Sequence, residues 1–124
     1  MVPGLNHDER TLARMAGMVR DVHATIPWHL NAFVPRYRLH AASPASSGLL
    51  MLAAGSAYVA GSRYVYVGNA SRAAELAHTR CPGCQSVVVR RHDYSTTENA
   101  LVRGACPRCA TPIEGLWERR AAPS

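Results

Sequence analysis

Two short cysteine pairs constrain the fold of this chain more than any other feature of its sequence. The pairs are Cys81-Pro-Gly-Cys84 and Cys106-Pro-Arg-Cys109, with twenty-one residues between them. Two intervening residues let both sulfurs of a pair face one ion, and two such knuckles supply a closed set of four thiolates. The pattern predicts a structural zinc ribbon with the metal ligands Cys81, Cys84, Cys106 and Cys109. Since these ligands fill all four coordination positions, the ion has no place for a substrate.

The spacing leaves two other interpretations of the cysteines open. The same four ligands can hold iron in a rubredoxin-like site, and four cysteines can also be buried apolar residues or redox pairs. In the zinc interpretation, we expect a hairpin of strands at Val87–Arg91 and Leu101–Arg103, with its turn near His92–Asn99. Four arginines are placed to offset the negative charge of a four-thiolate zinc site: Arg80, Arg90, Arg103 and Arg108.

The formal charge of +6 suggests nucleic acid as a partner. All fourteen basic residues are arginines, however, and they are scattered from Arg10 to Arg120. This distribution favours a solvated basic surface. A nucleic-acid-binding ribbon stays as an alternative, and it lacks interleaved aromatic residues, because only Tyr94 lies among the arginines that would carry it. Those arginines are Arg90, Arg91, Arg103 and Arg108.

No apolar run approaches the ~20 residues that span a bilayer, so no membrane partner is expected. The longest such run, Gly48–Ala60, is interrupted by Gly55 and Ser56. The first eight residues contain neither the cationic nor the apolar region of a signal peptide. We therefore expect a cytoplasmic protein, in which reduced cysteine pairs favour metal over disulfides.

The residues before the cysteines predict a short α/β segment. Apolar residues at helical spacing predict a helix over His7–His23, with Asn6 or Asp8 as its cap. A strand is expected at Ile26–Val34, and a loop follows over residues 36–47. A second helix at Leu49–Ala60 and a strand at Arg63–Gly68 complete a βαβ unit with parallel strands. Residues 70–79 are expected to form a linker with one or two helical turns.

Several strings in this order resemble one known protein family. They are Val2–Asn6, Pro27–Tyr37, Arg63–Asn69, the two cysteine knuckles and Thr111–Trp117. Together they resemble the C-terminal third of the AmmeMemoRadiSam-system radical SAM enzymes, which are relatives of the pyruvate formate-lyase activating enzymes. The resemblance implies that residues 1–75 are the closing βαβ segment of a partial (β/α) barrel. Residues 76–118 would be the zinc ribbon, and residues 119–124 a disordered tail.

The resemblance also implies what this chain lacks. Radical SAM chemistry needs a Cys-x3-Cys-x2-Cys loop that holds a [4Fe–4S] cluster, and no such triplet occurs here. The family usually has Phe-His-Pro where this chain has Phe33-Val34-Pro35, although His29 matches and is expected to be packed and hydrogen-bonded. No two of the eight carboxylates have a spacing that suggests acid/base catalysis, and neither a phosphate loop nor a nucleophile elbow is present. We therefore predict no catalytic residue and no [4Fe–4S] or S-adenosylmethionine site within this chain.

Three functions follow from these observations. The first is a non-catalytic C-terminal unit or remnant of a radical SAM protein, which completes or docks onto a partner chain or associates with itself. The second is the nucleic-acid-binding ribbon. The third is a subunit of a split radical SAM enzyme, in which a partner supplies the [4Fe–4S] cluster and S-adenosylmethionine.

Overall fold

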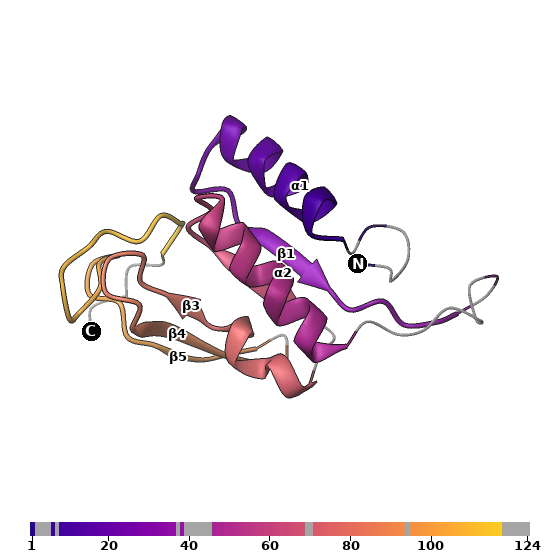
Figure 1. Ribbon diagram of the computed structural model, residues 1–124. Coiled ribbons are helices and arrows are strands. Elements are labelled where there is room, and N and C mark those ends of the chain that lie inside the picture. Colours follow the sequence, from indigo (N-terminus) through magenta and orange to yellow (C-terminus); the bar gives the residue numbers. More distant parts are fainter. Residues whose placement is uncertain are drawn as a thin grey trace. The chain divides into compact units, whose positions relative to one another are not determined.

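The computed structural model describes Met1, Asn6, Arg38 and the ranges 8–36, 46–68, 71–93 and 95–117. The chain divides into two compact units, Met1–Ala77 and His78–Ser124, which we call unit 1 and unit 2. In the described residues, unit 1 contains two helices, two strands and a 3₁₀ helix, and unit 2 contains three strands (Figure 1). Most of the segment Val2–Asn6, most of the predicted loop at residues 36–47 and the whole predicted tail at 119–124 lie outside the described residues.

The first helix, α1, runs over Glu9–Val22. Asp8 is its N-cap, because the carboxylate accepts a hydrogen bond of 2.9 Å from the backbone N–H of Thr11. The helix buries Leu12 and Ala16. The prediction also placed Asp8 and His23 in the helix, but Asp8 is the cap and His23 already has extended backbone angles. The predicted first residue, His7, lies outside the described residues.

The predicted βαβ unit is confirmed. Strand β1 (Trp28–Asn31) and strand β2 (Val65–Gly68) are parallel and aligned so that Leu30 is opposite Val67. Helix α2 (Ser47–Val59) connects them and is capped by the Ser46 hydroxyl. Strand β1 is shorter than the predicted strand at Ile26–Val34, since its only partner in the described part of unit 1 is the four-residue β2.

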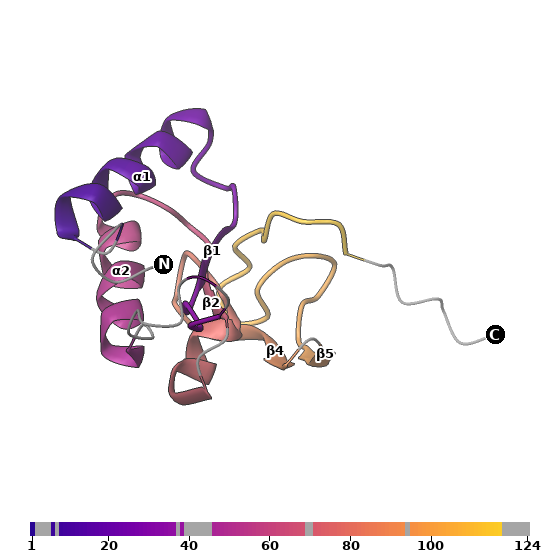
Figure 2. The ribbon, with the colours of Figure 1, turned by 90° about the vertical axis from the view of Figure 1, so that its right-hand side faces the viewer.

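The core of unit 1 lies between the helices and one face of the two-stranded sheet. Helices α1 and α2 lie side by side on the same side of β1 and β2 (Figure 2). The buried cluster is apolar and rich in alanine, which lets α2 pack closely: Leu12, Ala16, Leu30, Ala32, Leu50, Ala53, Ala54, Ala57, Val65 and Val67. The other face of the sheet presents the exposed residues His29 and Asn31.

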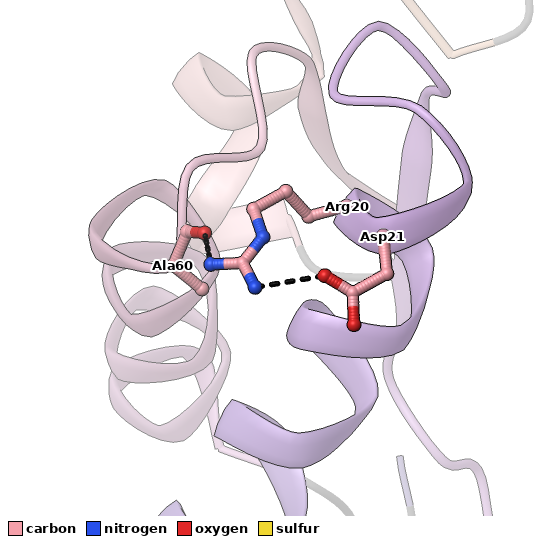
Figure 3. Close-up of polar contacts among 3 residues, drawn as sticks. All are labelled: Arg20, Asp21 and Ala60. Carbon is pink, nitrogen blue, oxygen red and sulfur yellow. Dashed lines mark hydrogen bonds and ion pairs between the residues drawn. The ribbon is translucent and has the colours of Figure 1, made fainter.

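The C-terminal end of α2 is joined to α1 through one arginine. The Arg20 guanidinium donates a hydrogen bond of 3.1 Å to the carbonyl of Ala60 and forms an ion pair of 2.8 Å with Asp21 (Figure 3). The chain then leaves the helix through Gly61, whose φ of +102° favours glycine. A Cβ atom at Gly61 would lie 3.0 Å from Cδ of Arg20. Arginine and glycine therefore fit together at this helix end.

Unit 2 is an antiparallel sheet of strands β3 (Thr79–Arg80), β4 (Val87–His92) and β5 (Ser95–Asn99), in that order. Strand β4 confirms the strand predicted at Val87–Arg91. The prediction of its partner at Leu101–Arg103 is wrong, because β5 occupies most of the segment that we expected to be the turn. Residues Leu101–Arg103 instead lead into a tight turn, with positive φ at both Arg103 and Gly104.

The predicted linker at residues 70–79 contains a 3₁₀ helix, η2, at Ser71–Ala77. The last residue of the linker, Thr79, is the first residue of β3. In the described part of the chain, no helix is long and apolar enough to cross a membrane.

Candidate metal centre

The four cysteine sulfurs of unit 2 come together at one point. All four Sγ atoms lie within 4.8 Å of one another, with 3.5 Å between Cys81 and Cys109 and 3.7 Å between Cys84 and Cys106. No disulfide joins any of them. A Zn–S bond of about 2.3 Å places the sulfurs of a tetrahedral site about 3.8 Å apart. The four cysteines are thus positioned to bind a metal ion.

The first knuckle is shaped by hydrogen bonds around Cys81. The backbone N–H of Gly83 lies 3.3 Å from the Cys81 sulfur, and that of Gln85 donates to the Cys81 carbonyl over 2.8 Å. Gln85 has a positive φ of 63°, which turns the chain back after the second cysteine. Gly83 has to be glycine here, because an added Cβ atom would collide with the side chain of Thr111.

The second knuckle repeats the geometry of the first. Ala110 matches Gln85: its N–H donates to the Cys106 carbonyl over 2.9 Å, and its φ is 61°. The backbone N–H of Cys106 donates to the Thr111 carbonyl over 2.9 Å, as Cys81 does to Ser86. The repeated Cys-Pro-x-Cys sequence therefore produces two equivalent loops, each of which presents two sulfurs to a common centre.

Two hydroxyl groups contact the sulfurs, and the sequence analysis missed both. Ser86 Oγ lies 2.9 Å from Cys84 Sγ and 3.6 Å from Cys106 Sγ. Thr111 Oγ1 lies 3.1 Å from Cys109 Sγ. Each hydroxyl residue comes two positions after the second cysteine of its knuckle, and this repeated spacing is a signal that could have identified them.

The surroundings raise the pKa of one thiol and lower the pKa values of two others. Burial raises the pKa of Cys81 to about 11. Burial acts in the same direction on Cys106, but hydrogen bonds from the Cys109 N–H, the Ser86 hydroxyl and the Arg108 N–H outweigh it and lower the pKa of Cys106 to about 6. The hydroxyl and N–H of Thr111 lower the pKa of Cys109. Hydrogen bonds thus favour the thiolate form of Cys106 and Cys109.

The four sulfurs differ in their exposure to solvent. Cys81 and Cys106 are buried, Cys84 is half-buried and Cys109 is exposed. Of the arginines predicted to offset the charge, Arg80 donates to the Gln85 carbonyl of the first knuckle over 3.2 Å. Arg90 instead pairs with Glu98 at 3.2 Å, on the neighbouring strand.

Trp117 closes the ribbon after the second knuckle. Its indole N–H donates to the Ile113 carbonyl over 2.8 Å, and Ile113 is buried. A Cβ atom at Gly104 or Gly115 would lie 3.2 Å or 2.9 Å from the indole ring. The two glycines therefore give the ring the room to lie against the backbone.

His29 lies in unit 1 and not in the metal centre. The prediction that it is a packed histidine is wrong in part, because its side chain is exposed on the uncovered face of the sheet. Its ring stacks on Tyr66, with 5.0 Å between the ring centroids and an interplanar angle of 23°.

Comparison with known proteins gives one relative of unassigned role. The chain is similar to an uncharacterized protein of Methanocaldococcus jannaschii, with 30% identity over 96 residues. The match covers 77% of this chain and 28% of that protein, so the chain spans less than a third of the relative's length. No family model and no solved structure matches the chain.

Proposed function

We propose that this chain is a non-catalytic C-terminal unit of a radical SAM-type protein. In this proposal, the βαβ segment of unit 1 completes a barrel whose other strands belong to a partner chain, and a structural zinc ion holds the ribbon of unit 2. The observation that carries the proposal is the open parallel sheet of unit 1, which holds only two strands in the described part of the chain. Parallel sheets are normally larger and covered on both faces.

The hydrogen-bonding groups along the outer edge of β1 support the idea that a neighbouring strand pairs there. The N–H group of Trp28 donates to the carbonyl of Tyr64, just before β2, and that of Ala32 donates to Gly68 at the end of β2. By alternation, the N–H groups of His29 and Asn31 point away from β2. The outward carbonyl of Asn31 accepts a hydrogen bond of 2.8 Å from the amino group of Met1. This contact is the one hydrogen bond that the described residues make along this edge, so a further strand can continue the sheet beside it.

The outer flank of α1 supports the same interpretation. Met15, Met18 and Val22 recur at helical spacing on one side of α1 and are exposed. Arg20, which reaches α2, lies on the other side of the helix. In a barrel, a neighbouring helix would cover an apolar flank of this kind.

Two further observations support the proposal: one concerns the joining of this unit to more structure, and the other concerns its place in the cytoplasm. The relative from Methanocaldococcus jannaschii carries the matching stretch in a much longer chain. The four described cysteines form no disulfide, which suits the reducing cytoplasm.

Zinc is the metal that the ribbon fits best, and its role is structural. Four thiolates fill a tetrahedral shell and leave no open position for chemistry. The described part of unit 2 has few other stabilising contacts, since its buried apolar side chains besides cysteine are Val88, Val89 and Ile113. We expect chelation, or Cys106→Ser, to unfold residues 78–117 while α1 and α2 persist, as measured by amide hydrogen exchange. A ribbon that keeps its protection without metal would contradict the structural role.

The proposal is tested by anaerobic reconstitution with iron and sulfide, followed by titration with S-adenosylmethionine in a calorimeter. We expect neither a [4Fe–4S] absorption band nor bound S-adenosylmethionine on this chain alone. The amide of His29 should exchange quickly in the isolated chain and slowly once a partner with the Cys-x3-Cys-x2-Cys loop is added. Binding of S-adenosylmethionine by the isolated chain, or a His29 amide that no such partner protects, would contradict the proposal.

The nucleic-acid alternative is weakened by contacts within the ribbon. Arg90 pairs with Glu98, and the Arg91 guanidinium donates to the Thr79 hydroxyl over 2.7 Å. Salt-dependent binding of a labelled generic oligonucleotide would favour this alternative. Cleavage of S-adenosylmethionine that requires both this chain and a cluster-bearing partner would favour the split enzyme.

A further inference from the structure

Helix α2 has a second apolar face that nothing in the described part of the chain covers. No charged residue occurs from Ser46 to Gly61, and a helix that is apolar all round is normally buried on all sides. One side of α2 does face the core of unit 1. On the other side, Met51, Leu52 and Val59 are 56%, 72% and 91% exposed.

This outer face alternates large and small residues along one seam. Gly48, Leu52, Gly55 and Val59 follow the four-three-four spacing of a seam between two packed helices. The glycines leave open space. Apart from the adjacent residues and the helix's own backbone, no heavy atom lies within 4 Å of a Cβ atom placed at Gly55, and at Gly48 the capping hydroxyl of Ser46 lies 4.0 Å away. The seam is therefore a row of two knobs and two holes.

The seam is complementary to itself. A two-fold axis between Ala53 and Ala54, perpendicular to α2, would bring a second α2 alongside in the antiparallel direction. In that pairing Leu52 lies opposite Gly55 of the other copy, and Val59 lies opposite Gly48. The flanking Met51 then lies opposite Ser56. Every layer would place a large side chain against a small one.

We propose that α2 pairs with α2 of a second copy of this chain, in an antiparallel two-fold dimer. A second copy fits this face better than a different protein, because each hole has its matching knob on the same helix. The absence of charge also removes the repulsion that like charges would create across a two-fold axis. A single 13-residue helix buries a small area, so we expect a dimer with a micromolar dissociation constant.

The test is analytical ultracentrifugation of the metal-loaded full chain over a range of concentrations, with three variants. Gly55→Leu fills the hole and should weaken the dimer about tenfold or more. It does not threaten the fold, because the added atoms point into open space and leucine is the better helix former. The double exchange Leu52→Gly with Gly55→Leu swaps knob and hole, so the dimer should return. Met18→Ser, on the exposed flank of α1, is the control that should leave the dimer unchanged.

Four results would overturn the proposal: a wild-type chain that stays monomeric at every concentration, a dimer that Gly55→Leu leaves intact, a double exchange that stays monomeric, or a dimer that Met18→Ser dissociates. The first of these would assign the face to a different protein. Far-ultraviolet circular dichroism of each variant confirms that a loss of association is not a loss of helix.

Discussion

At the scale of single residues, the metal centre depends on more than its four cysteines. Ser86 and Thr111 occupy equivalent places in the two knuckles, and their hydroxyls lie 2.9 Å and 3.1 Å from the sulfurs of Cys84 and Cys109. Groups that hydrogen-bond to metal ligands fix their orientation and spread their charge. They are therefore part of the site even though they do not touch the ion.

We predict that Ser86→Ala and Thr111→Val each weaken zinc binding about tenfold, because each removes a hydrogen bond to a metal-bound sulfur. Valine keeps the shape of threonine, so the packing around Gly83 is preserved. Competition with a chromophoric chelator measures the affinity. Thr97→Val, on the exposed strand β5, is the matched control, and an affinity unchanged in both knuckle variants would rule out this role.

The thiol pKa values predict how the affinity depends on pH. Metals bind the thiolate, and a pKa of about 11 keeps Cys81 protonated near neutrality, so binding must displace that proton. Affinity should therefore rise about tenfold per pH unit for this proton alone, as pH increases through neutrality. Below about pH 6, Cys106 also takes up a proton, and the loss of affinity should steepen. An affinity that is flat across neutrality in the same chelator competition would contradict the raised pKa of Cys81.

The four clustered cysteines could be predicted from sequence because each knuckle is local: two intervening residues fix the direction of both sulfurs. The hydroxyl residues Ser86 and Thr111 could also have been predicted, because each comes two positions after the second cysteine of its knuckle. The bond from Arg20 to Ala60 could not, because it depends on how α1 packs against α2, and no local pattern encodes that contact.

At the scale of elements, Trp117 fixes the end of the ribbon by lying against Gly104 and Gly115. We predict that Trp117→Ala lowers the free energy of unfolding of unit 2 by about 1–3 kcal/mol, since the ring is half-buried. Chelator-induced unfolding followed by near-ultraviolet circular dichroism measures this. The neighbouring Leu116 is fully exposed, so Leu116→Ala should cost less than about 0.5 kcal/mol. Equal effects of the two substitutions would contradict the packing of the indole.

The contact of Arg20 with the C-terminal end of α2 leads to a second prediction at the scale of elements. Arg20→Ala should lower the free energy of unfolding of unit 1 by about 1 kcal/mol, because it removes a charged donor from the C-terminal end of α2. Urea denaturation monitored by helical circular dichroism checks it. Arg14→Ala, at an exposed position of α1, should change the free energy of unfolding by less than about 0.5 kcal/mol. If Arg14→Ala lowered the free energy of unfolding more than Arg20→Ala did, the hydrogen bond from Arg20 to the Ala60 carbonyl would contribute nothing to stability.

The elements with a periodic pattern or a run of apolar residues were predicted, and those with neither were not. Helix α1 and strand β2 follow periodic patterns of apolar residues, whereas α2 and β4 coincide with apolar runs. Strand β5, Ser-Thr-Thr-Glu-Asn, is exposed at every residue, so its sequence carries no alternation to detect. It forms a strand because β4 offers it a hydrogen-bonded edge, and this is a tertiary cause.

At the scale of the whole molecule, the two units differ in what stabilises them. Unit 1 has an apolar core but an open sheet, and unit 2 has a small core and four converging sulfurs. We infer that unit 1 is stabilised further by association and unit 2 by its ion. The sequence predicted the order of the elements, but it could not predict which sheet edges stay open, because that depends on pairing across the whole chain.

The most direct test of this account is the metal content of the full chain, purified without air and without an affinity tag. We predict about one zinc per chain, with neither iron nor acid-labile sulfide. Iron together with sulfide would mean that these four cysteines hold a cluster. That result would contradict a structural zinc ribbon and a non-catalytic chain.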